Sequence, residues 1–295
     1  MIDTHAHLNF LQLSGQIETI VAESKKAGLT GIVIAGSNLK DSMVSIELAK
    51  KYPDFLSASV GIHPQNTNPD NQTQIENQLL ELENLIKSNK SEIPNSKLET
   101  SPNFQNSNSQ NVSDFDIRAS NFGSIVAIGE TGLDFSPAPQ GESDRNHEDQ
   151  EKLFQKQIDL AKKYQLPLII HAREAVDEVI SILQRSSPRD CRGVFHCYAG
   201  GKKRITKVLD LAGEWYFGFD GNLTYDEGLQ GIIPFIPKER IIIETDSPFL
   251  TPIPYRGEIN TPANLPFIQQ KINEILKEDL TDQVLQNTKI LFNLP

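Results

Sequence analysis

The chain is poor in the residues on which several common classes of protein depend. It has 2 cysteines in 295 residues, too few for a disulfide scaffold. Lysine and arginine total 28 against 39 acids, and the net charge of −11 argues against a broad basic surface that holds nucleic acid. No run of about 18 apolar residues is present, and the chain opens without a basic or apolar leader. We therefore expect a cytoplasmic protein that does not associate with membranes and has no obligate protein partner.

The sequence instead alternates short apolar runs with amphipathic segments. Eight runs are predicted strands, at residues 1–4, 31–35, 56–60, 125–128, 168–171, 194–196, 215–219 and 241–244. Segments with apolar residues spaced three and four apart are predicted helices, at 17–27, 39–51, 74–87, 147–164, 175–184, 202–211, 266–277 and 281–292. The alternation predicts an α/β fold, a single (β/α)8 TIM barrel in which residues 1–295 form one domain.

One segment interrupts this alternation. Residues from about 88 to 120 are dominated by Ser, Asn and Gln, and their few apolar residues have no period. Such a composition is typical of a solvated, flexible insertion in a folded domain. A partner-binding arm is the alternative interpretation.

Side chains that bind divalent metals directly follow several of the predicted strands. In a parallel barrel they would emerge at one end and converge on one pocket. Four of the chain's 6 histidines belong to this set. The arrangement predicts a two-metal hydrolase whose candidate ligands are His5, His7, Glu130, His171, His196 and Asp246.

The spacing of these residues suggests which of them would bind each metal ion. His5 and His7 lie on the same face of an extended backbone, so one ion can take both. Glu130 has glycine neighbours and two oxygens, which suit it to bridge two ions. His171 and His196 end consecutive strands and suit a second ion. For each histidine alone, the alternative is an ordinary buried or surface histidine.

The acids and the thiol near these positions receive separate predictions. Asp246 ends the most apolar strand and is predicted to coordinate the first ion and to accept a proton from water, with a capping role as the alternative. Asp134 is expected to stabilise its loop and Glu244 to form a buried polar contact, with a metal-ligand role as the alternative for each. Cys197 should point away from His196 on an extended backbone and serve packing.

Six motifs, in order along the chain, resemble those of the TatD family of metal-dependent hydrolases, as does a seventh segment. The resemblance covers the whole chain except the polar insertion. It implies an amidohydrolase-type barrel and divalent-metal-dependent hydrolysis of phosphodiester bonds in DNA, in some members as a 3′ to 5′ exonuclease. The motifs are Thr4-His5-Ala6-His7-Leu8, Val60-Gly61-Ile62-His63-Pro64, Gly129-Glu130-Thr131-Gly132-Leu133-Asp134, His171-Ala172-Arg173, His196-Cys197-Tyr198-Ala199-Gly200 and Glu244-Thr245-Asp246-Ser247-Pro248-Phe249-Leu250-Thr251-Pro252, and the later segment is Pro254-Tyr255-Arg256-Gly257.

The resemblance also implies roles for individual residues. His63 would face the scissile phosphate. Many members continue that motif as His-Pro-His, whereas this chain has Gln65 at the second histidine position, which leaves the role of that position open. One metal ion would be held by His5, His7, Glu130 and Asp246, and the other by Glu130, His171 and His196.

These observations give a working hypothesis and two alternatives. The chain would be a deoxyribonuclease with two divalent ions, Mg²⁺, Mn²⁺ or Zn²⁺, which polarise the phosphoryl oxygens while Asp246 takes a proton from the attacking water. His63, Arg173 and Arg256 are candidates to neutralise phosphate oxygens, with structural ion pairs as the alternative for both arginines. The acidic surface keeps open a metal-dependent deacylase or amidohydrolase acting on an ester or amide such as an aminoacyl-tRNA. A non-catalytic scaffold is the other alternative, and the complete ligand set argues against it.

Overall fold

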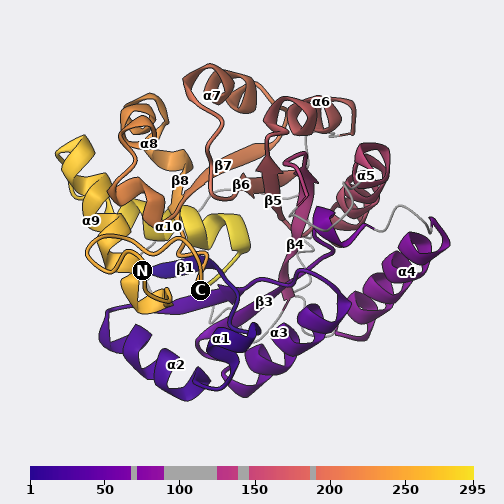
Figure 1. The fold of residues 1–295 in the computed structure, drawn as a ribbon, viewed down its shortest axis with the longest axis horizontal. Coiled ribbons are helices and arrows are strands. Elements are labelled where there is room, and N and C mark those ends of the chain that lie inside the picture. The colour runs from indigo at the N-terminus through magenta and orange to yellow at the C-terminus, as the bar shows by residue number, and fades with distance from the viewer. Residues whose placement is uncertain (68–71, 90–124, 139–145, 187–190) are drawn as a thin grey trace, which may run out of the picture.

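Eight parallel strands form a barrel at the centre of the molecule (Figure 1). The computed structural model describes residues 1–67, 72–89, 125–138, 146–186 and 191–295. Each strand pairs in parallel with the next one along the chain. The predicted (β/α)8 barrel is therefore confirmed. The strands are β1 (Ile2–Ala6), β2 (Gly31–Ile34), β3 (Leu56–Val60), β4 (Ile125–Asp134), β5 (Leu168–Arg173), β6 (Arg192–Phe195), β7 (Glu214–Phe219) and β8 (Ile241–Ile243).

The first and last strands meet at their carboxyl ends, and we call this junction the seam. A parallel bridge joins Ala6 to Ser247. Next to it, the Asp246 N–H donates to the His5 carbonyl at 2.9 Å. The sheet thus closes on itself at the end of the barrel where the predicted site residues lie.

Asp3 reinforces the seam through hydrogen bonds that join β1 to the segment after β8. Its buried carboxylate accepts the Thr245 N–H at 3.0 Å, the Thr245 hydroxyl at 2.6 Å and the His5 N–H at 3.2 Å. Burial raises the pKa of Asp3 to about 7, in spite of the hydrogen bonds from Thr245 and His5 that lower it.

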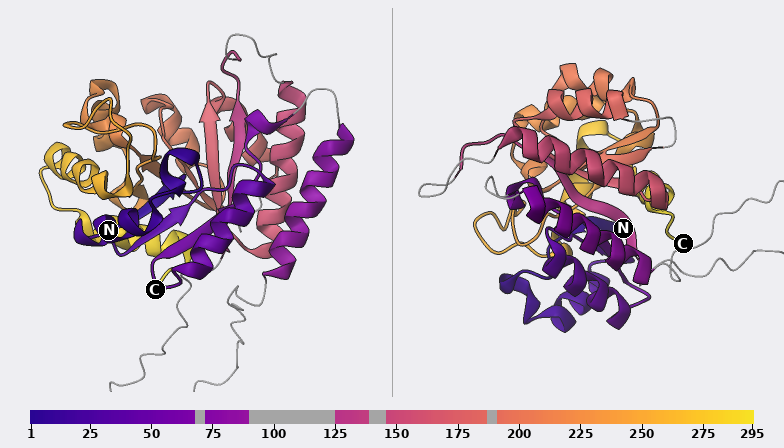
Figure 2. Two further views of the ribbon diagram at one scale, coloured as in Figure 1. Left: turned by 60° about the horizontal axis from the view of Figure 1, so that its bottom comes forward. Right: turned by 90° about the vertical axis from the view of Figure 1, so that its right-hand side faces the viewer.

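Helices surround the barrel on its outer side (Figures 1 and 2). In the described part of the chain, none of them combines the length and the apolar character needed to span a lipid bilayer. The α-helices are α1 (Leu11–Ser14), α2 (Ile17–Lys26), α3 (Leu39–Lys51), α4 (Gln72–Ser88), α5 (His147–Tyr164), α6 (Val176–Ser186), α7 (Lys202–Leu209), α8 (Glu227–Ile232), α9 (Leu265–Leu276) and α10 (Thr281–Phe292).

Helix α5 illustrates why these segments are helical. The Asn146 side chain caps its start by accepting the N–H groups of Glu148 and Asp149. The helix ends where Gln165 takes a positive φ of 56°. Apolar residues at helical spacing turn one face toward the barrel, including the buried Leu153, Phe154 and Ile158.

The core has two layers because successive strand residues point to opposite sides. Ile32 and Ile34 of β2 pack toward the outer helices, whereas Val33 between them packs inside the barrel. Leu291 and Phe292 of α10 pack against these interior residues. In the left view of Figure 2 both chain ends lie below the barrel, and the strand arrowheads point to its upper side. Helix α10 therefore covers the amino-terminal end, and the carboxyl end is left for the site.

Strand β4 differs most from the sequence prediction, since it continues through Asp134 rather than stopping at Ile128. Its glycines permit this extension: a Cβ on Gly129 would lie 2.6 Å from the Ile169 Cβ, and one on Gly132 would lie 2.0 Å from the His171 carbonyl oxygen. The short helices α1 and α8 were not predicted, because four and six residues give little periodicity. The predicted insertion at 88–120 lies outside the described residues, apart from residues 88 and 89.

Candidate metal centre

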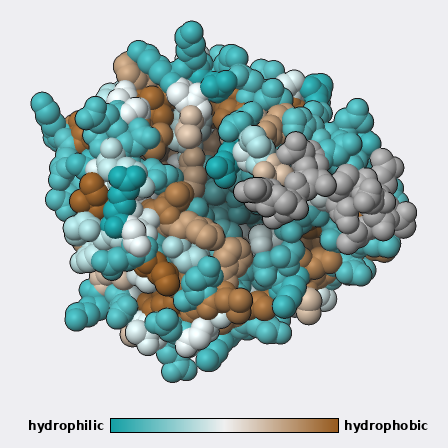
Figure 3. Space-filling model, in the orientation of Figure 1, coloured by the Kyte–Doolittle hydropathy of each residue, from teal (hydrophilic) through white to brown (hydrophobic). Residues whose placement is uncertain are grey.

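A pocket of about 1100 Å³ opens at the carboxyl ends of the strands. Figure 3 shows a hollow near the centre of this face. The site residues reach it because they share strand faces with interior residues, as His171 does with Ile169 and His196 with Val194. Of the six candidate ligands, His5 is fully buried beside His7, and the pocket is lined by the other five: His7, Glu130, His171, His196 and Asp246.

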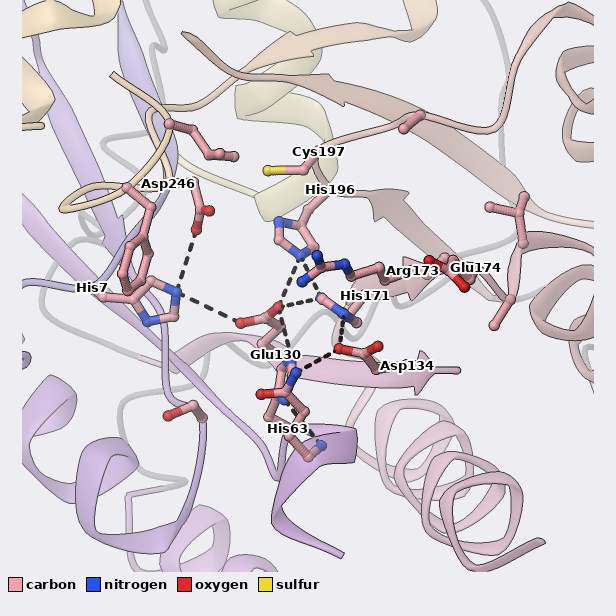
Figure 4. A pocket seen from close by; sticks show the side chains of 18 of the residues that line it. His7, His63, Glu130, Asp134, His171, Arg173, Glu174, His196, Cys197 and Asp246 are labelled. Atoms are coloured by element: carbon pink, nitrogen blue, oxygen red, sulfur yellow. Dashed lines mark hydrogen bonds and ion pairs between the residues drawn. The ribbon is translucent and has the colours of Figure 1, made fainter. Parts of the chain in front are cut away.

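Glu130 lies at the centre of the site, and its two oxygens face different sets of histidines (Figure 4). Oε2 lies 3.5 Å from His5 Nε2 and 3.6 Å from His7 Nε2. Oε1 lies 2.8 Å from His196 Nε2 and 2.9 Å from His171 Nδ1. One carboxylate thus connects His5 of β1 and the adjoining His7 with His171 of β5 and with His196, which directly follows β6.

His5, His7 and Asp246 form the group that we call the seam cluster. The Nε2 atoms of the two histidines are 3.2 Å apart. Asp246 Oδ1 lies 3.6 Å from His5 Nε2 and 3.4 Å from His7 Nε2. The space between the two Nε2 atoms holds at most one proton. At least one of these nitrogens is therefore unprotonated and keeps a lone pair.

His63, His171 and His196 form a second group, the β3–β6 cluster. His171 Nδ1 lies 3.3 Å from His196 Nε2. His63 Nε2 lies 3.3 Å from Glu130 Oε1, while its Nδ1 accepts the Gln65 N–H at 3.1 Å. Because Nδ1 is an acceptor, the neutral His63 ring carries its proton on Nε2 and directs it toward Glu130.

Asp134 supports the β3–β6 cluster from behind. It accepts the Ser136 N–H at 3.0 Å, in keeping with the predicted loop-stabilising role. Its Oδ2 also lies 3.2 Å from His171 Nε2 and accepts the Gln65 side-chain amide at 2.7 Å. This contact can hold a proton on His171 Nε2, which would leave Nδ1 as the ligand atom if a cation were bound.

Glu244 forms the buried polar contacts that were expected of it. It accepts the Thr4 hydroxyl at 3.1 Å and the Cys197 N–H, and its Oε1 lies 3.8 Å from His196 Nδ1. Cys197 differs from expectation: its φ is 46° rather than extended, and it lines the pocket. Asp246 also has a positive φ, 51°, so both residues are held in a sparsely populated conformation at the pocket wall.

The carboxylates of the site are held in the ionised form. Burial raises the pKa of Glu130, but the surrounding imidazoles, His63 foremost, hold it well below its ordinary value. Burial also raises the pKa of Asp246, but the hydrogen bond to His7 and the charges of the nearby imidazoles together outweigh it, so the net shift is downward. Both groups therefore offer negative charge within a largely buried pocket.

The imidazoles respond in opposite directions. Burial lowers the pKa of His5 to about 4. Burial lowers the pKa of His196 as well, but the adjacent Glu130 reverses the effect and raises it to about 10. His171 also has a raised pKa, because its hydrogen bonds to Asp134 and Glu130 outweigh burial. Protons on His171 and His196 thus balance the carboxylate charge, which is the role a divalent cation fills in a metal site.

Two predicted phosphate-binding arginines have different positions. Arg173 ends β5, is exposed and lines the pocket on the side opposite His7 (Figure 4). Arg256 is exposed, and its guanidinium lies 4.1 Å above the Tyr225 ring. Arg256 is not among the described residues that line the pocket. The structure thus places Arg173 at the pocket and Arg256 against an aromatic ring.

Sequence reasoning missed the contact between Asp134 and His171 and the two aromatic residues at the pocket rim, Phe10 and Phe249. The first had a signal, because Glu130 and Asp134 are four residues apart and lie on the same face of one strand. The aromatic pair had none, since each residue lies in a loop whose direction only the tertiary structure sets.

The donor atoms of the site fit divalent cations. Imidazole nitrogens and carboxylate oxygens are the ligands that Zn²⁺, Mn²⁺ and related ions take in proteins. In each of four groups the donor atoms lie within 4.8 Å of one another: His5, Glu130 and His196; His5, His7 and Asp246; His63, Glu130 and His171; and His196, Cys197 and Glu244.

Comparison with known proteins gives matches along the whole chain. A family model described as TatD related DNase matches residues 2–293. The metal-dependent hydrolase YabD of Bacillus subtilis is 28% identical over an alignment of 300 residues, which covers 100% of this chain and 99% of YabD. The 3'-5' ssDNA/RNA exonuclease TatD of Edwardsiella piscicida is 29% identical over an alignment of 307 residues, which covers 100% of both chains.

A solved structure shares the fold. The TatD homologue YjjV from Escherichia coli superimposes with a TM-score of 0.78 and 24% sequence identity, over 100% of this chain and 98% of that one. This structural likeness supports the barrel architecture independently of the sequence matches.

Proposed function

The chain belongs to the TatD-related DNase family and is a metal-dependent hydrolase, and from this premise we propose that it hydrolyses phosphodiester bonds of DNA, as a 3′ to 5′ exonuclease. We further propose that residues 1–295 act as one catalytic domain. The relative from Edwardsiella piscicida is named for single-stranded DNA and RNA, so DNA is the substrate we would test first.

The position of the Glu130 carboxylate carries the proposal of a two-metal site. One oxygen lies within 3.6 Å of both histidine Nε2 atoms of the seam cluster, and the other lies within 3.3 Å of a nitrogen of each β3–β6 histidine. A carboxylate so divided between two sets of nitrogen donors is suited to bridge two cations. One ion would be held by His5, His7, Glu130 and Asp246, and the other by Glu130, His171 and His196.

Divalent ions, when bound, would polarise the phosphoryl oxygens and lower the pKa of water, and Mg²⁺, Mn²⁺ and Zn²⁺ are the candidates. The residues of the chain then orient the reactants. Asp246 is ionised and lines the pocket, so it can accept the proton that the attacking water loses. The water oxygen bonds to phosphorus, the ester P–O bond breaks, and the leaving nucleoside oxygen takes up a proton.

Two cationic or proton-donating side chains could hold the phosphate. The Nε2 proton of His63 faces the centre of the site, where a phosphoryl oxygen can replace Glu130 as its acceptor. Arg173 lies on the pocket wall and can neutralise a non-bridging or neighbouring phosphate oxygen. Arg256, which contacts Tyr225, could act only on a strand that extends beyond the pocket.

The test is digestion of single-stranded DNA labelled at its 3′ or its 5′ end, with and without chelator. We expect rapid release of the 3′ label, stepwise shortening of the 5′-labelled strand, and no reaction with chelator. Ile259, which is 58% exposed and does not line the pocket, offers a control, and Ile259→Ala should behave as the unmodified protein. DNA that stays intact with Mg²⁺, Mn²⁺ and Zn²⁺ would refute the nuclease proposal.

The net charge of −11 favours a second candidate, since an acidic protein gives a long nucleic acid little electrostatic help. The same donor set could serve a deacylase that cleaves an acyl ester or an amide. A release assay that compares labelled DNA with an aminoacyl ester separates the two candidates. Hydrolysis of the ester without hydrolysis of DNA would refute the nuclease proposal and support the deacylase.

A further inference from the structure

Two aromatic rings stand at the pocket rim next to the seam cluster, and we call them the aromatic corner (Phe10 and Phe249). Their ring centroids are 6.0 Å apart and their planes meet at 76°. The His7 ring lies 4.4 Å from the Phe10 ring, nearly parallel to it, and 6.2 Å from the Phe249 ring. The corner therefore adjoins the seam cluster, which would hold one of the two proposed ions.

The aromatic corner exposes apolar surface that folding alone does not require. Phe249 is 44% exposed although it borders a pocket, and both rings line that pocket. The backbone of Phe249 is held in place: its N–H donates to the Asp246 carbonyl at 2.9 Å, and its carbonyl accepts the amide of the fully buried Asn260 at 2.7 Å. A ring that is carried on a fixed backbone and left in contact with water is suited to receive a flat apolar surface.

The opposite wall of the pocket has the opposite character. Arg173 lies on it, across Glu130 from His7 in Figure 4, and Arg204, which is paired with Asp177, also lines the pocket. The pocket thus has an aromatic wall, a cationic wall, and the ionised carboxylates between them. A nucleotide strand has the same division, because its bases are flat and apolar on their faces and its backbone carries negative charge.

We propose that Phe10 and Phe249 form a stacking platform for the nucleobase adjoining the scissile phosphate, so that the site accepts an unpaired strand end. The inference rests on the proposed function, since it extends the site of phosphodiester hydrolysis. A base within a duplex is already stacked and paired, and only an unpaired base can turn onto the rings. The phosphates beyond it would follow the cationic wall toward Arg173.

The test measures stacking directly, apart from turnover. The metal-loaded full-length protein is titrated into a short single strand with 2-aminopurine as its 3′-terminal base and a hydrolysis-resistant phosphorothioate at the last linkage. Stacking quenches 2-aminopurine fluorescence. A second strand ends in an abasic nucleotide, carries a fluorophore at its 5′ end and is followed by anisotropy.

We expect Phe249→Ala to weaken binding of the 2-aminopurine strand about 5- to 150-fold, the range for one lost stacking contact, and to abolish the quenching. Binding of the abasic strand should be unchanged. Phe249→Tyr should restore both binding and quenching, whereas Phe249→Leu, which keeps apolar bulk without a ring, should not. Ile259→Ala serves as the control for an exposed apolar residue outside the pocket.

The outcomes separate this proposal from the nuclease proposal. The platform is overturned if Phe249→Ala binds the 2-aminopurine strand and the abasic strand as tightly as the unmodified protein does. It is also overturned if the substitution weakens the binding of both strands equally, which would indicate a general disturbance of the pocket. Absence of quenching in the unmodified protein overturns it as well, even if labelled DNA is digested. Quenching that depends on Phe249 without any digestion retains the platform and refutes the nuclease.

Discussion

The seam cluster and the β3–β6 cluster share Glu130 but are held in place by different means. His5 and Asp246 are joined directly through their backbones at the seam, and the His5 side chain is 0% exposed. His171, with 16% of its side chain exposed, is oriented by the Asp134 side chain, which in turn contacts Gln65. The geometry of one cluster thus follows from closure of the barrel. The geometry of the other depends on individual side chains and should be more sensitive to single substitutions around it.

The largest effect is expected where the two clusters meet. Glu130→Ala removes the carboxylate that faces both, so we expect loss of metal from both sites and a fall in turnover on the order of 10³-fold or more. Elemental analysis of the purified variant and digestion of labelled DNA measure the two effects. Retention of two ions per chain with normal turnover would contradict the bridging assignment.

Asp246→Asn should remove the proposed proton acceptor while leaving the other residues of the seam cluster in place. The amide keeps the shape of the carboxylate but cannot accept the proton, so kcat should fall about 10²- to 10⁴-fold. The ion of the β3–β6 cluster should remain, because His171, His196 and Glu130 are unchanged. Metal content together with kcat and KM tests this; an unchanged kcat would remove Asp246 from its proposed role.

Asp134→Asn tests the dependence of the β3–β6 cluster on its supporting side chains. We expect about 10- to 100-fold weaker binding of one ion, since loss of an acceptor behind a ligating histidine has effects of this size. Asp134→Glu should recover part of the affinity, and Gln65→Ala should cost less than Asp134→Asn because it acts one contact further away. Metal titration by calorimetry should find the other ion unaffected. Equal weakening of both ions would refute the division into two clusters.

Asp177→Asn provides a baseline away from both clusters. Asp177 contacts Arg204 and Lys207, and the hydrogen bond from Arg204 lowers its pKa from the ordinary 3.8. These side chains are between 39% and 57% exposed, so we expect a loss of less than about 1 kcal/mol in the free energy of unfolding. A lowered folded-state pKa stabilises the fold above the ordinary pKa, and this is lost as the pH falls below it. Urea unfolding at pH 7 and at pH 3 should therefore show a larger difference at pH 7 than at pH 3.

The parts of the fold that depend on local periodicity were predictable from the sequence. The predicted bounds of β3, α3, α5 and α10 coincide with those observed, because buried strands and amphipathic helices carry a repeating apolar pattern. Strand β4 was underestimated because its glycines resemble a loop, although they are the residues that let β5 approach closely. The convergence of the candidate ligands followed from the barrel itself, since residues after parallel strands share one end.

Contacts that depend on loop direction were beyond sequence reasoning. Cys197 was expected to be extended, and its positive φ brings it to the pocket wall instead. Arg256 lies only ten residues after Asp246, yet its loop carries it to Tyr225. The hydrogen bonds that fix such loops come from distant parts of the chain, as when Asn260 binds the carbonyls of Thr245 and Phe249, and no local pattern records them.

The seam has a consequence for when activity can begin during synthesis. His5 and His7 leave the ribosome long before their carboxylate partner Asp246, and the bridge from Ala6 to Ser247 cannot form until that later segment has emerged. A nascent chain therefore lacks the seam cluster until Asp246 and Ser247 have left the ribosome. If the enzyme cleaves single-stranded nucleic acid, this order delays its activity until the part of the messenger that encodes the barrel strands has been read.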